Sequence, residues 1–336
     1  MLGMLLAGGL CVHPRLARAS AAAAAWQRFR ARFVTPEGRT VDTGNGGVSH
    51  SEGQGWTLLL AAAFDDRPTF RLVHDWTRRT LARPTDSLSS WRYRPTGNPP
   101  VDDPNNATDG DLYIAWALAN ASRRWNDAAL AAAAAAIGRD VLRLLTREVA
   151  GRLVLLPGAA GFEDGRRVVI NPSYYVFPAF AALEQLVPDP RWRRLAADGL
   201  ALLREGRYGK WRLPPDWLAI QRPNGALAPA EGWPPRFSFD AVRVPLLLAW
   251  AGQRGEPAVA AARRFWRDPT HSVPPAWVDL TTGQVADFPA SEGVRAIADF
   301  IAAGAGTTTA VLPLATHDDY YSASLKMLVL VAGLRD

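Results

Sequence analysis

Apolar positions divide the chain into two kinds of predicted helix. One kind is apolar on nearly all sides, which is typical of a helix inside a domain; it comprises 57–64, 112–121, 177–187, 241–251 and 323–333. The other kind is arginine-rich and amphipathic, as expected of an outer layer; it comprises 68–82, 126–148 and 191–206. Alternating inner and outer helices joined by short connections predict an all-α fold, a closed ring of helical hairpins.

Strand signals are few. Glycine, proline and β-branched residues between 151 and 171 predict one small β-hairpin inserted into the helical fold. The proline pairs at 214–215, 234–235 and 274–275 predict loops. Because no low-complexity linker or shift in composition interrupts the rest, we expect residues 20–336 to form a single domain.

Every predicted inner helix follows a polar prefix. The five prefixes read "SHSEGQ", "NNATDGD", "INPSYY", "RFSFD" and "HDDYYS". Inner helices of such a ring run parallel, so their N-terminal ends share one face. The pattern therefore predicts that five polar segments meet at one mouth of the ring.

Four acidic residues lie in or beside these prefixes: Glu52, Asp109, Asp111 and Asp240. Each has a purely structural alternative. Glu52 would close a capping box with Ser49, Asp109 would cap its helix, and Asp240 would favour a helix dipole. Together they point elsewhere, because several carboxylates at one mouth repel each other and need a reason to coexist.

Paired carboxylates among aromatic side chains are what glycoside hydrolysis needs. One carboxylic acid protonates the leaving oxygen, while the other carboxylate activates water or attacks the sugar. Aromatic faces near the prefixes are candidates for stacking on sugar rings: Trp56, Trp91, Tyr174, Tyr320 and Tyr321. Trp116 and Trp250, in the middle of predicted helices, are expected in the core.

Composition excludes several other classes. The net charge of +6 is carried almost wholly by evenly spread arginine, since Lys210 and Lys326 are the only lysines, so no nucleic-acid partner is expected. The sequence holds no phosphate-binding loop, no nucleophile elbow and no His/Cys spacing for zinc. We therefore expect neither a cofactor nor a metal.

The N-terminus indicates export. Residues 1–12 form an apolar stretch that contains Cys11, the only cysteine. Ala17 and Ala19 follow in an A-x-A arrangement suited to cleavage after Ala19, so residues 1–19 are predicted to be a signal peptide. The stretch is too short for a stable membrane anchor. We expect a periplasmic or secreted protein without disulfides and without an anchor after cleavage.

Longer motifs resemble glycoside hydrolase family 8, the inverting endoglucanases. The resemblance rests on "GRTVDTGNGGVSHSEGQGWTLLLAAAFDDRPTFRLVHDWT", "WRYRP", "NNATDGDLYIAWAL", "INPSYYVFPAF", "FSFDAVRVPLLLAW" and "YYSASLKML". It covers roughly residues 26 to 333 and is strongest for the periplasmic cellulases encoded with bacterial cellulose synthases. The fold it implies is an (α/α)6 barrel of six helical hairpins, in agreement with the pattern.

The resemblance also implies residue roles. Glu52 matches the general acid, Asp240 matches the general base, and Asp109 matches the residue that holds the distorted sugar. Arg243 matches an arginine beside the base, and Trp56 stands where the family usually has tyrosine. As an inverting enzyme must fit a water molecule beside the base, we expect the two catalytic carboxyl groups about 6.5–9.5 Å apart.

The expected activity is thus that of an endo-β-1,4-glucanase acting on β-1,4-glucan, with the cellulose synthase complex as an expected partner. Two alternatives stay open. A hydrolase of the same fold would act on xylan, chitosan or mixed-linkage glucan. A non-catalytic glucan-binding subunit would need no acid and base pair, which Glu52 and Asp240 supply.

Overall fold

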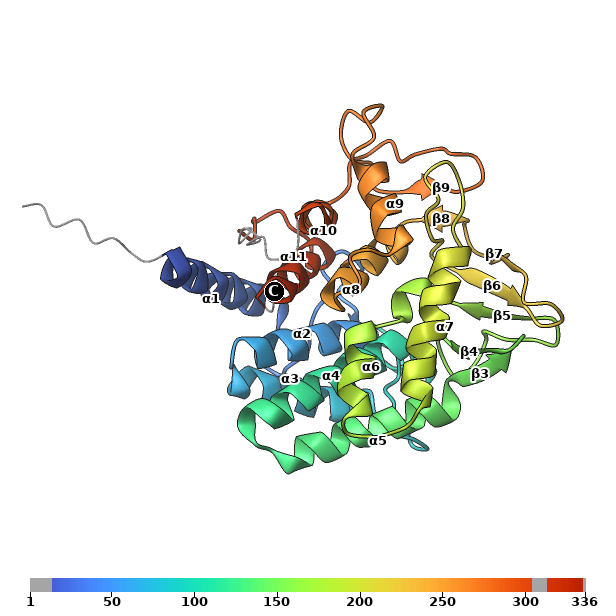
Figure 1. Ribbon diagram of the computed structural model, residues 1–336. Coiled ribbons are helices and arrows are strands. Elements are labelled where there is room, and N and C mark those ends of the chain that lie inside the picture. Colours follow the sequence, from blue (N-terminus) through green and yellow to red (C-terminus); the bar gives the residue numbers. More distant parts are fainter. Residues whose placement is uncertain (1–13, 304–312, 335–336) are drawn as a thin grey trace, which may run out of the picture.

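The protein is described by a computed structural model that covers residues 14–303 and 313–334. Six helices in these ranges form the inner ring, and each packs on the next until the last returns to the first. They are α2 (Ser51–Ala63), α4 (Thr108–Trp125), α6 (Phe177–Glu184), α8 (Val244–Trp250), α10 (Glu292–Ala302) and α11 (Tyr320–Ala332). This closed ring confirms the predicted helical barrel (Figure 1).

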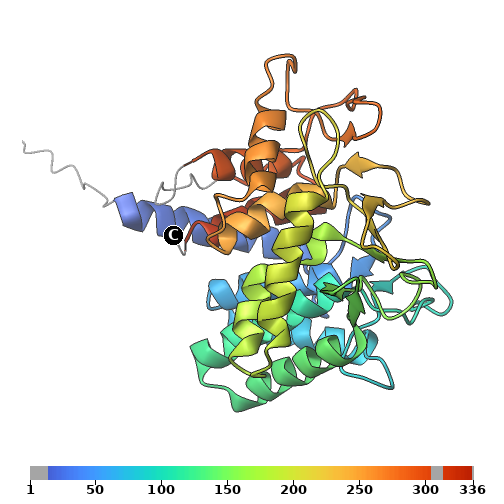
Figure 2. The ribbon, with the colours of Figure 1, turned by 45° about the vertical axis from the view of Figure 1, so that its right-hand side comes forward.

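The remaining helices form an outer layer (Figure 2). They are α1 (Pro14–Phe33), α3 (Arg67–Thr80), α5 (Ala128–Leu144), α7 (Arg191–Glu205) and α9 (Pro257–Trp266). The predicted outer helices are confirmed. Each turns a buried stripe toward the ring, as Phe70 and Val73 do in α3, and keeps its arginines on the outside.

Helix α10 is an inner helix that the apolar pattern did not single out. The N–H of Gly293, in its first turn, donates to Ser322 Oγ in the first turn of α11 at 3.0 Å. The two helices therefore run parallel, as inner helices do. In the described part of the connection between them, residue 303 and residues 313–319 contain no helix.

The inner helices begin earlier than their apolar runs. Helix α2 starts at Ser51 and α4 at Thr108, so "SEGQ" and "TDGD" form first turns rather than preceding loops. Two short 3-10 helices, η1 (Pro172–Tyr174) and η2 (Ala241–Arg243), lead into α6 and α8. The polar prefixes are thus built into the helix starts.

Nine short strands occur among the described residues, and β3 to β9 lie together on one side of the barrel in Figure 1. The pairs and sheets are antiparallel. They are β1 (Ser49–His50) with β2 (Arg92–Tyr93), β3 (Thr146–Val149) with β4 (Arg152–Leu155), β5 (Arg167–Ile170) with β6 (Leu218–Gln221) and β7 (Leu227–Pro229), and β8 (Arg236–Phe237) with β9 (Val278–Asp279).

The predicted hairpin between 151 and 171 is wrong in its pairing. Both expected strands exist, but β4 pairs backward with β3, and β5 pairs forward with β6 and, through a bridge of Val168 with Glu163, with the segment just before it. Ala150 and Gly151, both at positive φ, make the tight turn between β3 and β4. The long glycine-rich loop after β4 then carries the chain away, and β5 buries Val168 and Ile170 beside β6.

The signal-peptide prediction falls mainly outside the described residues, because 1–13 are not among them. Residues 14–19 form the first part of α1, which continues without a break past Ala19. No helix in the described ranges is long and apolar enough to cross a membrane.

Candidate active site

Glu52 lies in the first turn of α2 and does not close a capping box. The N-cap position of α2 is His50, whose side chain makes no capping hydrogen bond, while Ser49 lies in β1. The Glu52 carboxylate instead forms an ion pair with Arg243, and its side chain is 21% exposed. The side chain therefore points across the ring rather than back along its own helix.

Glycines bring the helix starts close together. A Cβ on Gly110 would lie 2.2 Å from Ser51 Oγ and 2.6 Å from the backbone nitrogen of Glu52. A Cβ on Gly53 would lie 2.5 Å from the hydroxyl oxygen of Tyr320. Only glycine fits these positions without a shift, so the glycines of "SEGQG" and "TDGD" let the first turns of α2, α4 and α11 meet.

Asp109 lies in the first turn of α4 and is almost completely buried. It is not the N-cap, a position that Ala107 occupies. Its Oδ1 accepts the N–H of Gly110 at 2.8 Å, and its Oδ2 lies 3.4 Å from Arg243 Nη1. Burial raises the pKa of Asp109 from its usual range to about 7.

Asp240 directly precedes η2 and faces the same arginine. Arg243 Nη2 donates to Asp240 Oδ1 at 2.6 Å, and the Asp240 side chain is 30% exposed. Desolvation and the carboxylates of Asp216 and Asp109 raise the pKa of Asp240 well above its usual range. The ion pair with Arg243 opposes that rise, because a cation in contact favours the carboxylate.

Arg243 joins the prefixes into one site. Its buried guanidinium contacts Glu52, Asp109 and Asp240, and its Nη2 also donates to Ser173 Oγ at 3.0 Å. Four of the five polar prefixes therefore meet around one side chain. The fifth prefix contributes Tyr321, whose hydroxyl donates to the carbonyl oxygen of Phe239 beside Asp240. The predicted gathering of the prefixes at one mouth is confirmed.

Among the aromatic candidates, Trp91, Tyr174 and Tyr321 are partly exposed. Tyr174 lies near Asp109 and Asp240, whose charges add to the effect of burial in raising its pKa. Trp91 lies beside the start of α2, where its carbonyl oxygen accepts the N–H of Ser51 at 3.0 Å. Tyr174 and Tyr321 therefore have side-chain surface beside the acids, while the indole N–H of Trp91 donates to Asp103 Oδ2 at 2.8 Å.

Trp56 and Tyr320 are buried instead. Trp56 has no exposed surface, and Tyr320 is only 2% exposed. Their rings stack at 6.4 Å, and the Arg243 guanidinium lies 5.7 Å from the Trp56 ring. The expected contact of these two side chains with a sugar does not fit their burial; they form an aromatic support under Arg243. Trp116 is in the core, as expected.

Two residues at the site were missed from the sequence. Phe239, beside Asp240, is 56% exposed and packs its ring 6.3 Å from that of Tyr321. Asp216 is buried and accepts hydrogen bonds from Ser238 and Ala241. The prefix "RFSFD" held a signal for Phe239 in its position next to an acidic residue. Asp216 lies in a proline-rich loop with no periodic signal.

Asp111 does not join the cluster. Its buried carboxyl accepts the N–H of Ser89 at 2.8 Å and the side-chain amide of Asn106 at 2.9 Å. It therefore ties the segment between α3 and α4 to the start of α4. Burial raises its pKa to about 8.

In the described ranges, one cluster of side chains has the spacing of metal ligands: the carboxylates of Glu292 and Asp318 and the imidazole of His317. The amine of Lys326 contacts Glu292 and lies 2.7 Å from Asp318, so a lysine charge already sits between these acids. His50 pairs with Asp42 at 3.7 Å rather than with Glu52. These contacts account for the residues without a bound ion.

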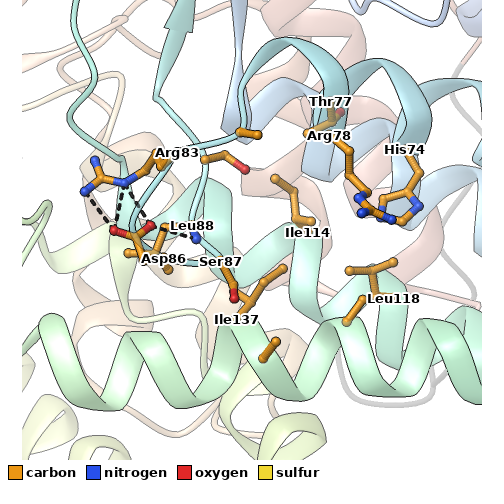
Figure 3. Close-up of a pocket in the computed structure, with 14 residues that line it drawn as sticks. His74, Thr77, Arg78, Arg83, Asp86, Ser87, Leu88, Ile114, Leu118 and Ile137 are labelled. Carbon is orange, nitrogen blue, oxygen red and sulfur yellow. Dashed lines mark hydrogen bonds and ion pairs between the residues drawn. The ribbon is translucent and has the colours of Figure 1, made fainter.

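A cavity of about 340 Å³ lies apart from the carboxylates, between α3, α4 and α5 (Figure 3). Its floor is apolar, with Leu88, Ile114 and Ile137, while Arg83 and Asp86 form an ion pair at its edge. None of the predicted site residues lines it. The candidate active site is therefore the mouth of the ring and not this cavity.

This is a helical barrel in which the first turns of the inner helices carry an acid pair, a shared arginine and partly exposed aromatic rings. Such an architecture is that of a glycoside hydrolase. Comparison with known proteins agrees with this class. Residues 10–334 match the glycosyl hydrolases family 8, and the chain belongs to this family.

Relatives resemble the chain over nearly its whole length. A probable endoglucanase from Novacetimonas hansenii is 46% identical over 93% of this chain and 91% of the relative. The structure of the endo-β-1,4-glucanase CMCax from Acetobacter xylinum has a TM-score of 0.87 and 46% identity, over 94% of this chain and 98% of that one. Endoglucanase Cel10 from Klebsiella pneumoniae, a family 8 glycosyl hydrolase, has a TM-score of 0.88 and 42% identity, over 93% and 99%.

Proposed function

We propose that the protein is an endo-β-1,4-glucanase that cleaves internal bonds of β-1,4-glucan by a single displacement with inversion. The observation that carries the proposal is the contact of one buried arginine, Arg243, with Glu52, Asp109 and Asp240. Three carboxylates from different helix starts are thereby held in one place. The similarity to endoglucanases over the whole chain supports the choice of substrate.

Glu52 is the general acid in this proposal. Its proton passes to the glycosidic oxygen as the bond between that oxygen and the anomeric carbon breaks. Asp240 takes a proton from a water molecule, whose oxygen forms the new bond at the opposite face of the same carbon. The leaving chain departs as an alcohol, and the attacked sugar carries the new hydroxyl in the inverted configuration.

Asp109 holds the sugar at the point of cleavage. Because its pKa is raised to about 7, its carboxyl group retains a proton over much of the acidic range and is able to donate a hydrogen bond to a sugar hydroxyl. Arg243 holds the carboxyl groups of Glu52 and Asp240 in place by contacting both. Trp91, Tyr174 and Tyr321 supply exposed surface for neighbouring sugar rings.

The cellular location and the partner of the protein belong to the same proposal. Export to the periplasm or beyond is supported by the apolar stretch 1–12 and the A-x-A site at Ala17 and Ala19. Action beside a cellulose synthase complex is supported by the resemblance of the motifs to cellulases encoded with such synthases. N-terminal sequencing of exported protein tests the first part, with a start at Ser20 expected.

The activity is tested by the viscosity of carboxymethylcellulose incubated with the full chain or with the Glu52→Gln variant. We expect a rapid fall in viscosity with few new reducing ends for wild type. The rate of hydrolysis by the variant should be at least about a hundredfold lower, because its amide cannot act as a proton donor of the required acidity. Unchanged thermal unfolding of the variant is the control for folding.

Other outcomes would redirect the proposal. No fall in viscosity between pH 4 and 8, together with cleavage of xylan, chitosan or mixed-linkage glucan, would move the substrate and keep the chemistry. Binding of cello-oligosaccharides without turnover of any of these polymers would identify a glucan-binding subunit. Near-normal turnover by Glu52→Gln would remove Glu52 from the role of acid.

A further inference from the structure

Asp216 is a buried carboxylate beside the proposed base, and it takes no part in the proposed reaction. It lies in the loop before β6 and is only 7% exposed. Its Oδ1 accepts the N–H of Ser238 at 3.0 Å and the N–H of Ala241 at 2.8 Å. Its Oδ2 accepts the hydroxyl of Ser238. One side chain thus binds the backbone on both sides of Asp240.

This arrangement frees the side chain of Asp240. Asp240 occupies the N-cap position of η2, where an aspartate usually accepts an N–H of the first helical turn. Here the Asp240 side chain makes no such bond, and the first N–H of η2 is taken by Asp216. The Asp240 carboxylate is therefore available to contact Arg243 and whatever occupies the mouth.

Asp216 also acts on Asp240 through its charge. When ionised, its carboxylate is one of the causes that raise the pKa of Asp240, while burial raises the pKa of Asp216 itself. The titratable, charged and amide groups that face Asp240 come from several elements: Asp216, Asp109, Arg243, Tyr174, Tyr321 and Asn171. Of the two acids in that set, only Asp216 also binds the segment that carries Asp240, while Asp109 contacts Arg243.

We propose that Asp216 is a positioning residue for Asp240: it fixes the backbone around the base, and its negative charge sets the lower pH limit at which the base works. This inference rests on the proposed function, in which Asp240 is the general base. Asp216 itself does not touch the reacting atoms in this role.

Two substitutions separate position from charge. Asp216→Asn removes the charge but keeps Oδ1 for both backbone N–H groups, and its amide is able to donate to the hydroxyl oxygen of Ser238. Asp216→Ala removes the charge and all three hydrogen bonds. Each variant is made in the full chain, checked by thermal unfolding, and assayed on a soluble cello-oligosaccharide from pH 3 to 8.

The Asn variant tests the charge. A general base must be ionised, so kcat/KM falls as the pH drops through the pKa of Asp240. Without the negative charge of Asp216 that pKa is lower, and the acidic limb moves down by about half a pH unit or more. We expect kcat at the optimum to stay within about threefold of wild type, because the hydrogen bonds remain. An unmoved acidic limb would overturn the role of the charge.

The Ala variant tests the position. We expect kcat to fall at least about tenfold while KM changes less than about threefold, because the base is displaced and the sugar contacts remain. Recovery of kcat in Asp216→Asn assigns the loss to lost hydrogen bonds. Wild-type kcat in a folded Ala variant would overturn the positioning role, and so would an equal loss of kcat in a folded Asn variant.

Asp198→Asn is the matched control. Asp198, on α7, also accepts a backbone N–H, from Leu153 at 2.8 Å, but it is not among the groups that act on Asp240. The acidic limb of the pH profile of kcat/KM for Asp198→Asn should coincide with that of wild type. Wild-type protein that cleaves no glucan would contradict the proposed function itself. If wild type is active, Asp240→Asn is inactive and the Asp216 variants keep the kcat and pH profile of wild type, only the present inference is contradicted.

Discussion

Arg243 carries one positive charge among three carboxylates, and this imbalance shapes the chemistry of the site. If Glu52, Asp109 and Asp240 were all ionised, two uncompensated negative charges would remain in a largely buried place. Such a cluster favours keeping at least one proton at neutral pH. A site that must hold a proton for a leaving group and a carboxylate for water needs that mixture of protonation states.

The stereochemistry of the reaction tests the role of Asp240. Proton NMR of freshly cleaved cello-oligosaccharide should show the α-anomer first, because water attacks the β-linked carbon from the opposite face. Asp240→Asn should lose at least about a hundredfold in kcat without unfolding. Early appearance of the β-anomer would contradict a single displacement, and with it the expected wide separation of the carboxyl groups.

Asp111 predicts a pH dependence of stability. Burial raises its pKa from 3.8 to about 8, so between these values the folded chain holds a proton that the unfolded chain releases. The free energy of unfolding therefore falls as the pH rises through this window. Asp111→Asn does not titrate and should lose this part of the slope.

Urea unfolding at pH 5 and pH 8 measures the effect. The stability of wild type relative to Asp111→Asn should be lower at pH 8 than at pH 5 by at least about 1 kcal/mol. Comparing the two proteins at each pH removes the contribution of all other groups. If wild type and Asp111→Asn differ in free energy of unfolding by the same amount at pH 5 and pH 8, Asp111 is ionised at both.

At the scale of elements, the close approach of α2 and α4 holds Glu52 next to Asp109. A Cβ on Gly55 would lie 2.6 Å from the Tyr113 Cβ and 3.0 Å from the backbone nitrogen of Ile114. These contacts leave no room for a methyl group, and neither partner is the free end of a flexible side chain. The spacing of the two helices is therefore set by glycine.

Gly55→Ala should push the two helices apart. Overpacking of this kind costs about 1–3 kcal/mol, which exceeds the gain of about 1 kcal/mol that alanine brings to a helix. Both stability and kcat should fall, as measured by urea unfolding and by hydrolysis. Gly165→Ala, at a site with no atom within 4 Å of the added Cβ, is the control and should change neither. A stable, fully active Gly55→Ala variant would contradict the argument.

Helices α2 to α8 and α11 were predictable from the sequence because an inner or outer position leaves a local signal in the apolar pattern. The pairing of β5 was not, because β5 pairs with Leu218–Gln221, about fifty residues further on. Helix α10 was overlooked because it is amphipathic although it belongs to the inner ring. In both cases the missing information was a contact between distant segments.

On the scale of the whole molecule, the outer helix α1 packs on α11 and supports the site through Tyr320. Trp26, Phe29 and Phe33 are buried, and Trp26 Nε1 donates to Asp66 Oδ2 at 3.0 Å. The rings of Phe29 and Phe33 lie 6.3 Å and 5.7 Å from that of Tyr320. These buried side chains all follow Ala19, so cleavage there leaves them in place.

Truncation tests this division of α1. A chain that starts at Ser20 should keep the melting temperature of the full chain to within a few degrees, because the side-chain hydrogen bond that it loses from the described residues is that of Arg18 with the carbonyl oxygen of Gly333. A chain that starts at Val34 should not fold, because each buried aromatic side chain contributes about 3–5 kcal/mol and the whole fold is stable by about 5–15 kcal/mol. Circular dichroism during heating measures both.

The sequence by itself determined the helical ring and the carboxylates Glu52, Asp109 and Asp240 as members of one mouth. It did so because parallel inner helices place their polar first turns on one face. Only the tertiary structure decided which aromatic side chains face the mouth, with Tyr321 partly exposed there and Trp56 buried. It also decided that Asp216 serves the segment around Asp240. Both depend on contacts between residues far apart in the chain, and no local pattern of apolar and polar residues records those contacts.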